Sequence, residues 1–338
     1  MNGKERIQCA LDGVWPDQRP VMLHNFQMAA REAGITMKEY RNHPQKAAQA
    51  HINAVEKYDA DGVLVDIDTA TLAGAVGVPV DFPVHEPART RGGLLLSLDG
   101  LDRLRSVHIE TNERILIWLE TCALVKRYFA DEKYIRGNCD QAPFSLASLI
   151  RGPENWMVDL VTNPEKSHEL LKICTGFTIQ FIELMAGTGV DMLSNGDSPA
   201  GPEMISPDLY DEYAWPYEKE VVKRAHALGL PYVLHICGNT DLILYRMVQT
   251  GVDGLELDYK TDIEHIREVL SDRCVFFGNL DPVNVIERGT PNLIRQKVRE
   301  LSQWFRDSPR FILNAGCAIP PDTPSENIHA MIQSVRKP

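Results

Sequence analysis

Short runs of aliphatic and β-branched residues alternate with longer amphipathic stretches along most of the chain. The short runs are typical of buried parallel strands, and apolar residues recurring every three or four positions are typical of helices that pack on one face. The expected strands are 20–26, 62–68, 134–140, 190–195, 231–237, 252–258, 274–279 and 310–316. The helices expected between them include 45–58, 111–129, 208–228, 262–271, 291–305 and 323–335.

This repeated order of strand and helix predicts an α/β fold, a closed (β/α)8 TIM barrel. An open doubly wound sheet is the alternative, but no expected strand is followed by the glycine fingerprint of a dinucleotide site. Two segments exceed a minimal barrel: an N-terminal helix over 1–18 and an elaboration over 69–110. The elaboration, with short strands expected at 78–82 and 94–98, should cover one end of the barrel. Because no linker composition divides the chain, residues 1–338 are expected to form one domain.

The composition excludes several classes of protein. A hydrophobic content of 44% and a charged content of 24% are ordinary for a globular protein. The net charge of −12 disfavours binding to nucleic acid or to an anionic membrane. No stretch approaches the ~20 apolar residues of a membrane span, and the N-terminus lacks an export signal. We therefore expect a cytoplasmic protein whose seven cysteines are reduced and available as metal ligands.

Polar side chains follow almost every expected strand, where the catalytic groups of such barrels lie. Burying them unpaired would be costly, so we expect them to line a solvated cavity. Lys260 is the only lysine or arginine expected near these strand ends, so the cavity should repel a polyanionic substrate. The polar residues at the strand ends are His24, Asn25, Asp66, Asp68, Asn138, Cys139, Asp140, Asn195, Asp197, His235, Cys237, Glu256, Asp258, Asn279, Asp281, Asn314 and Cys317.

The most specific motif is His235-Ile236-Cys237. Residues two apart in a strand face the same way, so the imidazole and the thiol should both face the lumen, where they are suitable zinc ligands. Cys317, after the last expected strand, supplies a third ligand. Three protein ligands leave one coordination position open, as in catalytic zinc sites.

Other interpretations of these residues remain open. Buried cysteines often serve only packing. His235 and Cys237 could form a nucleophile and its base, although parallel side chains of one strand seldom face each other. Glu256 is a candidate for a fourth zinc ligand or for orienting His235. The other candidates, each also explicable by structural hydrogen bonding, are Asp68 and Asp197 for catalysis, and His24, Asn25, Asn279 and Asp281 for substrate binding.

Three motifs resemble the uroporphyrinogen decarboxylase superfamily. They are Gly278-Asn279-Leu280-Asp281-Pro282, Ala142-Pro143-Phe144-Ser145 and the segment 316–328. His235, Cys237 and the distant Cys317 resemble the branch that includes methylcobamide:coenzyme M methyltransferases, in which such residues bind catalytic zinc. The decarboxylase's arginine-rich segment is replaced here by 24–29, which has no lysine or arginine, and Cys317 stands in place of a histidine. Asp68, in contrast, matches an acid of the decarboxylase pattern.

The resemblance implies a zinc-dependent methyltransferase that moves a methyl group between a methylcobamide and a thiol or thioether, with a zinc-bound thiolate as nucleophile. The corrinoid is expected on a partner protein, because the chain has no Asp-x-His-x-x-Gly signature. A cofactor-free decarboxylase and a methyl-donor:corrinoid methyltransferase are the alternatives. The sequence names neither the methyl donor nor the acceptor, and it is compatible with a homodimer.

Overall fold

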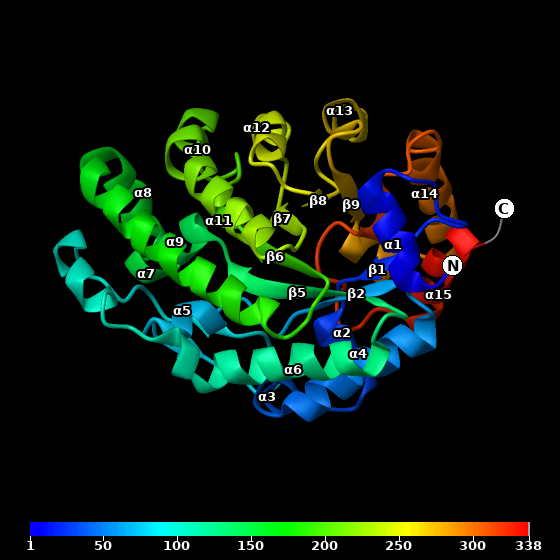
Figure 1. Cartoon of the computed structure of the whole chain (residues 1–338), viewed down its shortest axis with the longest axis horizontal. Helices are drawn as coiled ribbons and strands as arrows, with labels where there is room; N and C mark the ends of the chain where they lie inside the picture. Colours follow the sequence, from blue (N-terminus) through cyan, green and yellow to red (C-terminus); the bar gives the residue numbers. More distant parts are fainter. Residues whose placement is uncertain (337–338) are drawn as a thin grey trace.

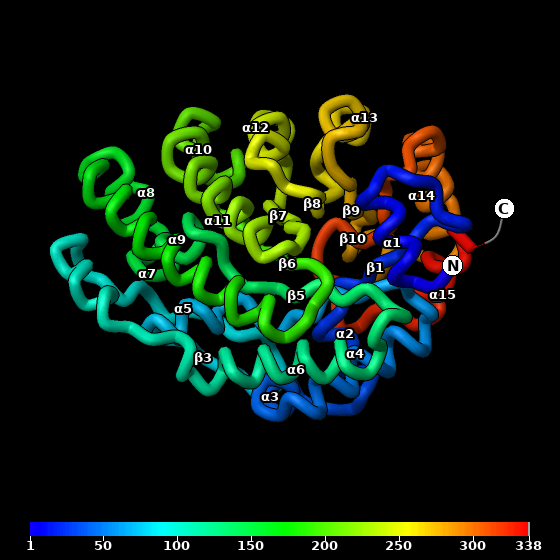
Figure 2. Tube along the Cα trace, viewed as in Figure 1, coloured from blue at the N-terminus to red at the C-terminus, as the bar shows by residue number. Residues whose placement is uncertain are grey.

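The computed structural model describes residues 1–336, and an eight-stranded parallel barrel lies at its centre (Figures 1 and 2). Its strands are β1 (Met22–Leu23), β2 (Gly62–Val65), β5 (Tyr134–Gln141), β6 (Met192–Gly196), β7 (Tyr232–Ile236), β8 (Gly254–Leu257), β9 (Val275–Leu280) and β10 (Phe311–Ala315). They are hydrogen-bonded in that order, and a parallel bridge between Val21 and Leu313 joins the last strand to the first. The predicted barrel is therefore confirmed.

Helices form an outer ring around these strands (Figure 1). The helices of the ring and its connections are α2 (Phe26–Glu32), α3 (Met37–Asn42), α4 (Pro44–Tyr58), α5 (Thr71–Ala75), α6 (Glu113–Phe129), α7 (Pro143–Arg151), α8 (Pro153–Thr162), α9 (Pro164–Ala186), α10 (Pro207–Tyr213), α11 (Trp215–Ala227), α12 (Leu244–Gln249), α13 (Ile263–Leu270), α14 (Pro291–Trp304) and α15 (Ser325–Arg336), with a 3-10 turn η3 (Ser198–Ala200) and a π-helix η4 (Pro282–Glu287). The single helix expected over 208–228 is two helices, because Pro216 opens a new helix directly after α10.

The N-terminal helix α1 (Gly3–Asp12) closes one end of the barrel. It is shorter than expected, because Gly13 adopts a left-handed conformation (φ 70°) and ends it. Its Ile7 and Ala10 are fully buried in a cluster with Met22, Tyr134 and other residues from the first halves of the strands. The opposite end, where the strands finish, is the end left for a functional site.

The segment 69–110 differs in detail from the expectation. Its strands β3 (Val80–Asp81) and β4 (Arg89–Thr90) form a small antiparallel pair, followed by 3-10 helices η1 (Leu98–Leu104) and η2 (Ile109–Thr111). The strand expected at 94–98 is absent, because the Leu94 and Leu95 amides donate to Ile150 at the end of α7. The 3-10 helices pack against α9, whereas Thr69 and Pro87 reach the cavity at the barrel mouth.

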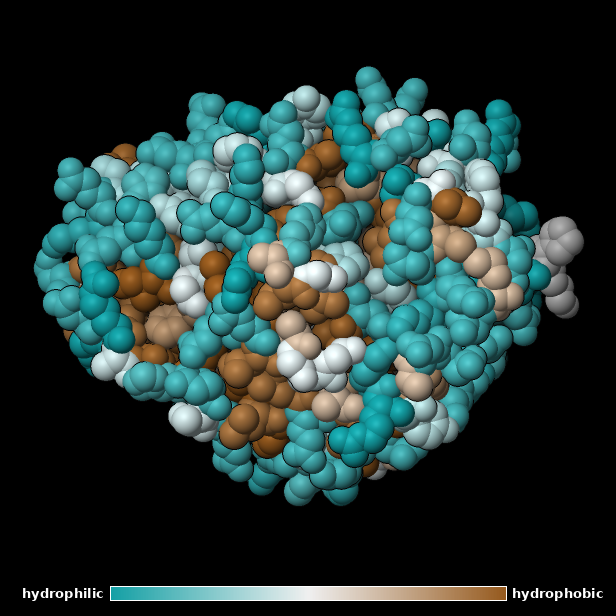
Figure 3. Space-filling view, in the orientation of Figure 1, coloured by the Kyte–Doolittle hydropathy of each residue, from teal (hydrophilic) through white to brown (hydrophobic). Residues whose placement is uncertain are grey.

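The face shown in Figure 3 is largely hydrophilic, with smaller hydrophobic patches between the polar side chains. Most large apolar residues instead lie in one extensive core between the barrel and the helices. Within residues 1–336, no helix combines the length and hydropathy needed to span a bilayer.

Candidate active site

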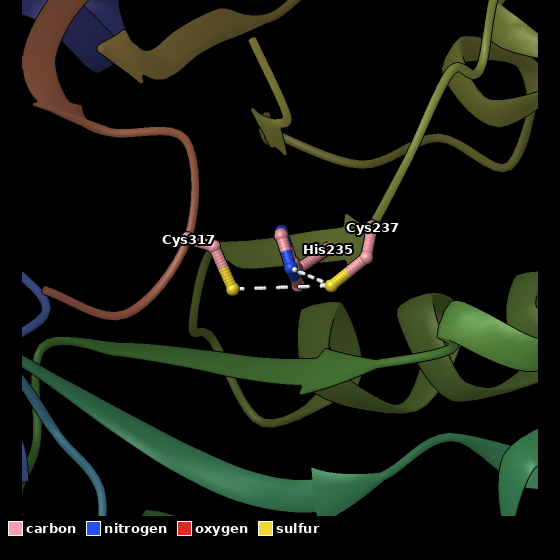
Figure 4. Close-up of side chains that lie close together, drawn as sticks. All are labelled: His235, Cys237 and Cys317. Atoms are coloured by element: carbon pink, nitrogen blue, oxygen red, sulfur yellow. Dashed lines mark hydrogen bonds between the residues drawn. The ribbon is translucent and has the colours of Figure 1, made fainter. Parts of the chain in front are cut away.

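His235, Cys237 and Cys317 converge at the mouth of the barrel (Figure 4). His235 lies on β7, Cys237 directly follows that strand, and Cys317 follows β10. The His235 Nε2 atom is 3.0 Å from the Cys237 Sγ, which is 3.9 Å from the Cys317 Sγ. Among the residues the structure describes, these three form the one group of histidine, cysteine and acidic side chains whose ligand atoms all lie within 4.8 Å of one another.

His235 and Cys237 both line the cavity, as their spacing predicts, and their side-chain ends also meet, which is uncommon for two residues of one strand. The reason is that β7 ends at Ile236 and the chain turns at Gly238, whose φ is 87°. A Cβ at Gly238 would lie 2.8 Å from the carboxylate carbon of Glu203, which is the end of a flexible side chain, so it is the backbone conformation that favours glycine there.

Hydrogen bonding within the group favours a thiolate. The Cys317 thiol donates to Cys237 and lowers the pKa of Cys237, as does the nearby His235, against the effect of burial. The same hydrogen bond, together with burial, holds the pKa of Cys317 well above its usual value. Burial alone would lower the pKa of His235, but the Cys237 thiolate raises it to about 10. The group thus already stabilises negative charge on sulfur.

The three donors fit a zinc ion. Zinc held tetrahedrally at ~2.3 Å from sulfur and ~2.05 Å from nitrogen places two sulfurs about 3.8 Å apart and a sulfur and a nitrogen about 3.6 Å apart. The sulfur–sulfur distance of 3.9 Å matches this value, and the 3.0 Å between His235 and Cys237 needs only a small opening. His235 also donates from Nδ1 to the Glu256 carbonyl oxygen at 2.9 Å, which leaves Nε2 as the ligand atom.

The Glu256 carboxylate lies behind His235 rather than among the three donors. It accepts hydrogen bonds from Arg136 and from the His24 Nδ1 at 3.0 Å, and its nearest oxygen is 3.9 Å from the His235 Nδ1. Burial would raise the pKa of Glu256, but Arg136 and His24 hold it well below the usual range. The contact between Glu256 and His235 therefore runs through the backbone carbonyl.

Arg136 is the functional residue that sequence reasoning missed. Lys260 is not the only cation near the strand ends, because Arg136 on β5 lies inside the barrel and lines the cavity. Arg136 lies early in β5, away from the strand end, and its long side chain lines the cavity. A charged residue within an otherwise buried strand was the available signal.

The three donors open into a cavity of about 290 Å³. Its volume is at the lower end for ligand sites and suits a small molecule. Of the candidate site residues, His24, His235, Cys237, Glu256 and Cys317 line this cavity, together with Asp66, Asn138, Asp140 and Asn195 from the strand ends.

The remaining candidates lie outside the cavity lining. Asp68 accepts from the Ala70 amide and the Thr71 hydroxyl, and Asp197 accepts from the amide and hydroxyl of Ser145. Three further candidates share this placement. Asp281 caps η4, Asn279 donates to the Asp258 carbonyl, and Asn25 is fully buried.

Comparison with known proteins agrees with the observed architecture. The family model of uroporphyrinogen decarboxylase (URO-D) matches residues 2–338. The methylcobamide:CoM methyltransferase MtbA of Methanosarcina acetivorans is 32% identical over 240 residues, 71% of this chain and 68% of the relative. A uroporphyrinogen decarboxylase from a Synechococcus species is 27% identical over 90% of each chain. A solved methyltransferase structure from Methanosarcina mazei has a TM-score of 0.87 at 22% identity, covering 99% of this chain and 98% of the other. The chain belongs to the uroporphyrinogen decarboxylase family.

Proposed function

We propose that the protein is a zinc-dependent methyltransferase that moves a methyl group between a corrinoid and the sulfur of a small thiol or thioether. The observation that carries this proposal is the convergence of His235, Cys237 and Cys317 on one cavity. The similarity to a methylcobamide:CoM methyltransferase supports the class of reaction.

His235, Cys237 and Cys317 would hold the zinc and leave one position open to the substrate. Bound zinc would lower the pKa of a substrate thiol in that position, so that it reacts as a thiolate near neutral pH. With zinc bound, Cys237 and Cys317 would both be thiolates, would balance the metal's charge and would keep the substrate sulfur electron-rich. The backbone carbonyl of Glu256 holds the His235 ring in the orientation that this ligand set needs.

In the transfer, the substrate sulfur would form a bond to the methyl carbon as the corrinoid departs with the electron pair of its cobalt–carbon bond, and the thiol proton would leave to solvent. The chain's part is to orient the sulfur in the cavity, where Phe26, Leu64 and Ala318 contribute apolar wall. Because a cavity of about 290 Å³ is too small for a corrinoid ring, the corrinoid would approach from the mouth, presented by a partner protein.

Metal analysis tests the proposal. Purified protein is expected to contain about one zinc per chain and, without oxygen, to demethylate methylcobalamin in the presence of a small thiol. Cys317→Ser should lose most of the zinc and the transfer, whereas Cys9→Ser, on α1 far from the mouth, should retain both. Wild-type protein that binds no zinc at micromolar concentration would contradict the proposal.

Decarboxylation of uroporphyrinogen is a second candidate, because a relative of that activity matches 90% of the chain. The cavity argues against it, since the substrate carries many carboxylates and Arg136 is already paired with Glu256. Formation of a decarboxylated product from uroporphyrinogen would decide in its favour.

A further inference from the structure

The charges that line the cavity specify the kind of thiol. We infer that the substrate of this site carries an uncharged or positively charged group at its far end, in place of a sulfonate or carboxylate. This inference rests on the proposed function and deepens it. It separates the chain from its relative MtbA, whose name states coenzyme M, a thiol with a sulfonate, as the acceptor.

Both cations of the cavity wall are already paired with carboxylates. Arg136 is 1% exposed and hydrogen-bonds Glu256, which is fully buried. His24 lies between Glu256 at 3.0 Å and Asp66 at 3.3 Å. An anionic substrate group would have to compete with these buried carboxylates for the same partners, at a high desolvation cost.

Two other cations, Lys260 and Arg31, are engaged outside the cavity lining. Lys260 forms a half-exposed ion pair with Glu203 at 3.0 Å. Arg31 pairs with Asp322 at 2.6 Å and lines a neighbouring hollow that shares Gln27 with the cavity. Within the part of the chain that the structure describes, neither contributes to the wall around the three donors.

The charge balance of the lining is neutral to negative. Its carboxylates are Asp66, Asp140 and Glu256, against the two cations Arg136 and His24. Burial lowers the pKa of His24, but Glu256 and Asp66 raise it to about 9, so this histidine carries a charge. Burial raises the pKa of Asp140, so the sum lies between zero and one negative charge. The two cysteines and a divalent metal cancel each other. A sulfonate would therefore meet no net positive potential, whereas an ammonium or hydroxyl group would find acceptors.

Three thiols with the same two-carbon spacer test the inference on zinc-loaded protein: 2-mercaptoethanol, cysteamine and coenzyme M. Their dissociation constants are measured by calorimetry without corrinoid. We expect coenzyme M to bind at least tenfold more weakly than the other two. Because the thiols differ in acidity, the comparison is repeated in Gln27→Lys and Gln27→Glu. Gln27 is a half-buried residue of α2 that lines the cavity rim. Gln27→Lys should reduce, severalfold, the ratio of the dissociation constant of coenzyme M to those of the other two thiols, and Gln27→Glu should increase this ratio.

Tighter or equal binding of coenzyme M by the wild type would overturn the inference. The inference would also be overturned if neither Gln27 variant changed the ratio of dissociation constants, because the selection among thiols would then not be electrostatic. These outcomes differ from failure of the proposed function itself, which would show as absence of zinc and of methyl transfer to all three thiols.

Discussion

The buried ion pair between Arg136 and Glu256 gives the sharpest test of how the site is supported. Arg136→Met replaces the guanidinium with an apolar side chain of similar length and leaves Glu256 with His24 as its remaining cation. Removing one partner of a buried pair typically costs ~3–5 kcal/mol, because the other charge stays buried without compensation. Since His24 still donates to Glu256 at 3.0 Å, we expect the low end, about 3 kcal/mol.

Urea unfolding followed by circular dichroism measures this cost as a change in the free energy of unfolding. The double variant Arg136→Met/Glu256→Gln removes both charges and should recover about 2 kcal/mol of the loss. The matched control is Arg105→Met, which breaks a pair with Glu169 in which both side chains are about half exposed. Such a surface pair should change stability by less than about 1 kcal/mol.

The reasoning is refuted if Arg136→Met costs no more than Arg105→Met. It is also refuted if the loss of unfolding free energy in the double variant equals the sum of the losses in Arg136→Met and Glu256→Gln, because the two groups would then not interact. Either result would remove the ground for treating the Arg136 charge as neutralised within the cavity.

Two further predictions concern a buried acid and a glycine. Burial and the neighbouring Asp197 raise the pKa of Glu218 well above 4.5. The contribution of Glu218 to stability is therefore complete below about pH 4.5 and is lost as the pH rises through its folded-state pKa. The neutral Glu218→Gln variant does not lose stability in this way. The free energy of unfolding of the variant relative to wild type should therefore increase from pH 5 to pH 9, by about 1.4 kcal/mol for each pKa unit of the shift. Thermal unfolding across this range checks it, and parallel stability curves would contradict it. Gly316→Ala would place a Cβ 2.8 Å from the Tyr259 amide nitrogen and displace Cys317, so zinc content should fall at least tenfold. Gly176→Ala, whose Cβ meets nothing within 4 Å, should keep its zinc, and equal zinc in both variants would count against a strict placement of Cys317.

The sequence alone determined the barrel and the three converging donors. Strands buried on both faces are continuous apolar runs, so each is visible from its own residues, and the expected strands 62–68 and 231–237 match β2 and β7 within a few positions. In a closed parallel barrel all strand ends meet at one mouth, which is why Cys317 could be placed near His235 across eighty positions of chain. The hypothesis of a zinc site followed from topology and ligand chemistry.

The tertiary structure decided what surrounds those donors. The close approach of the His235 and Cys237 side chains depends on where β7 ends. The role of Glu256 depends on its hydrogen bonds with Arg136 on β5 and with His24, which follows β1. The burial of Asp68 and Asp197 in backbone hydrogen bonds likewise depends on loops that the periodicity does not describe. Hydrophobic patterning reports which face of an element is buried, whereas charge pairing depends on side-chain lengths and directions across elements, and these are fixed only when the elements are packed together.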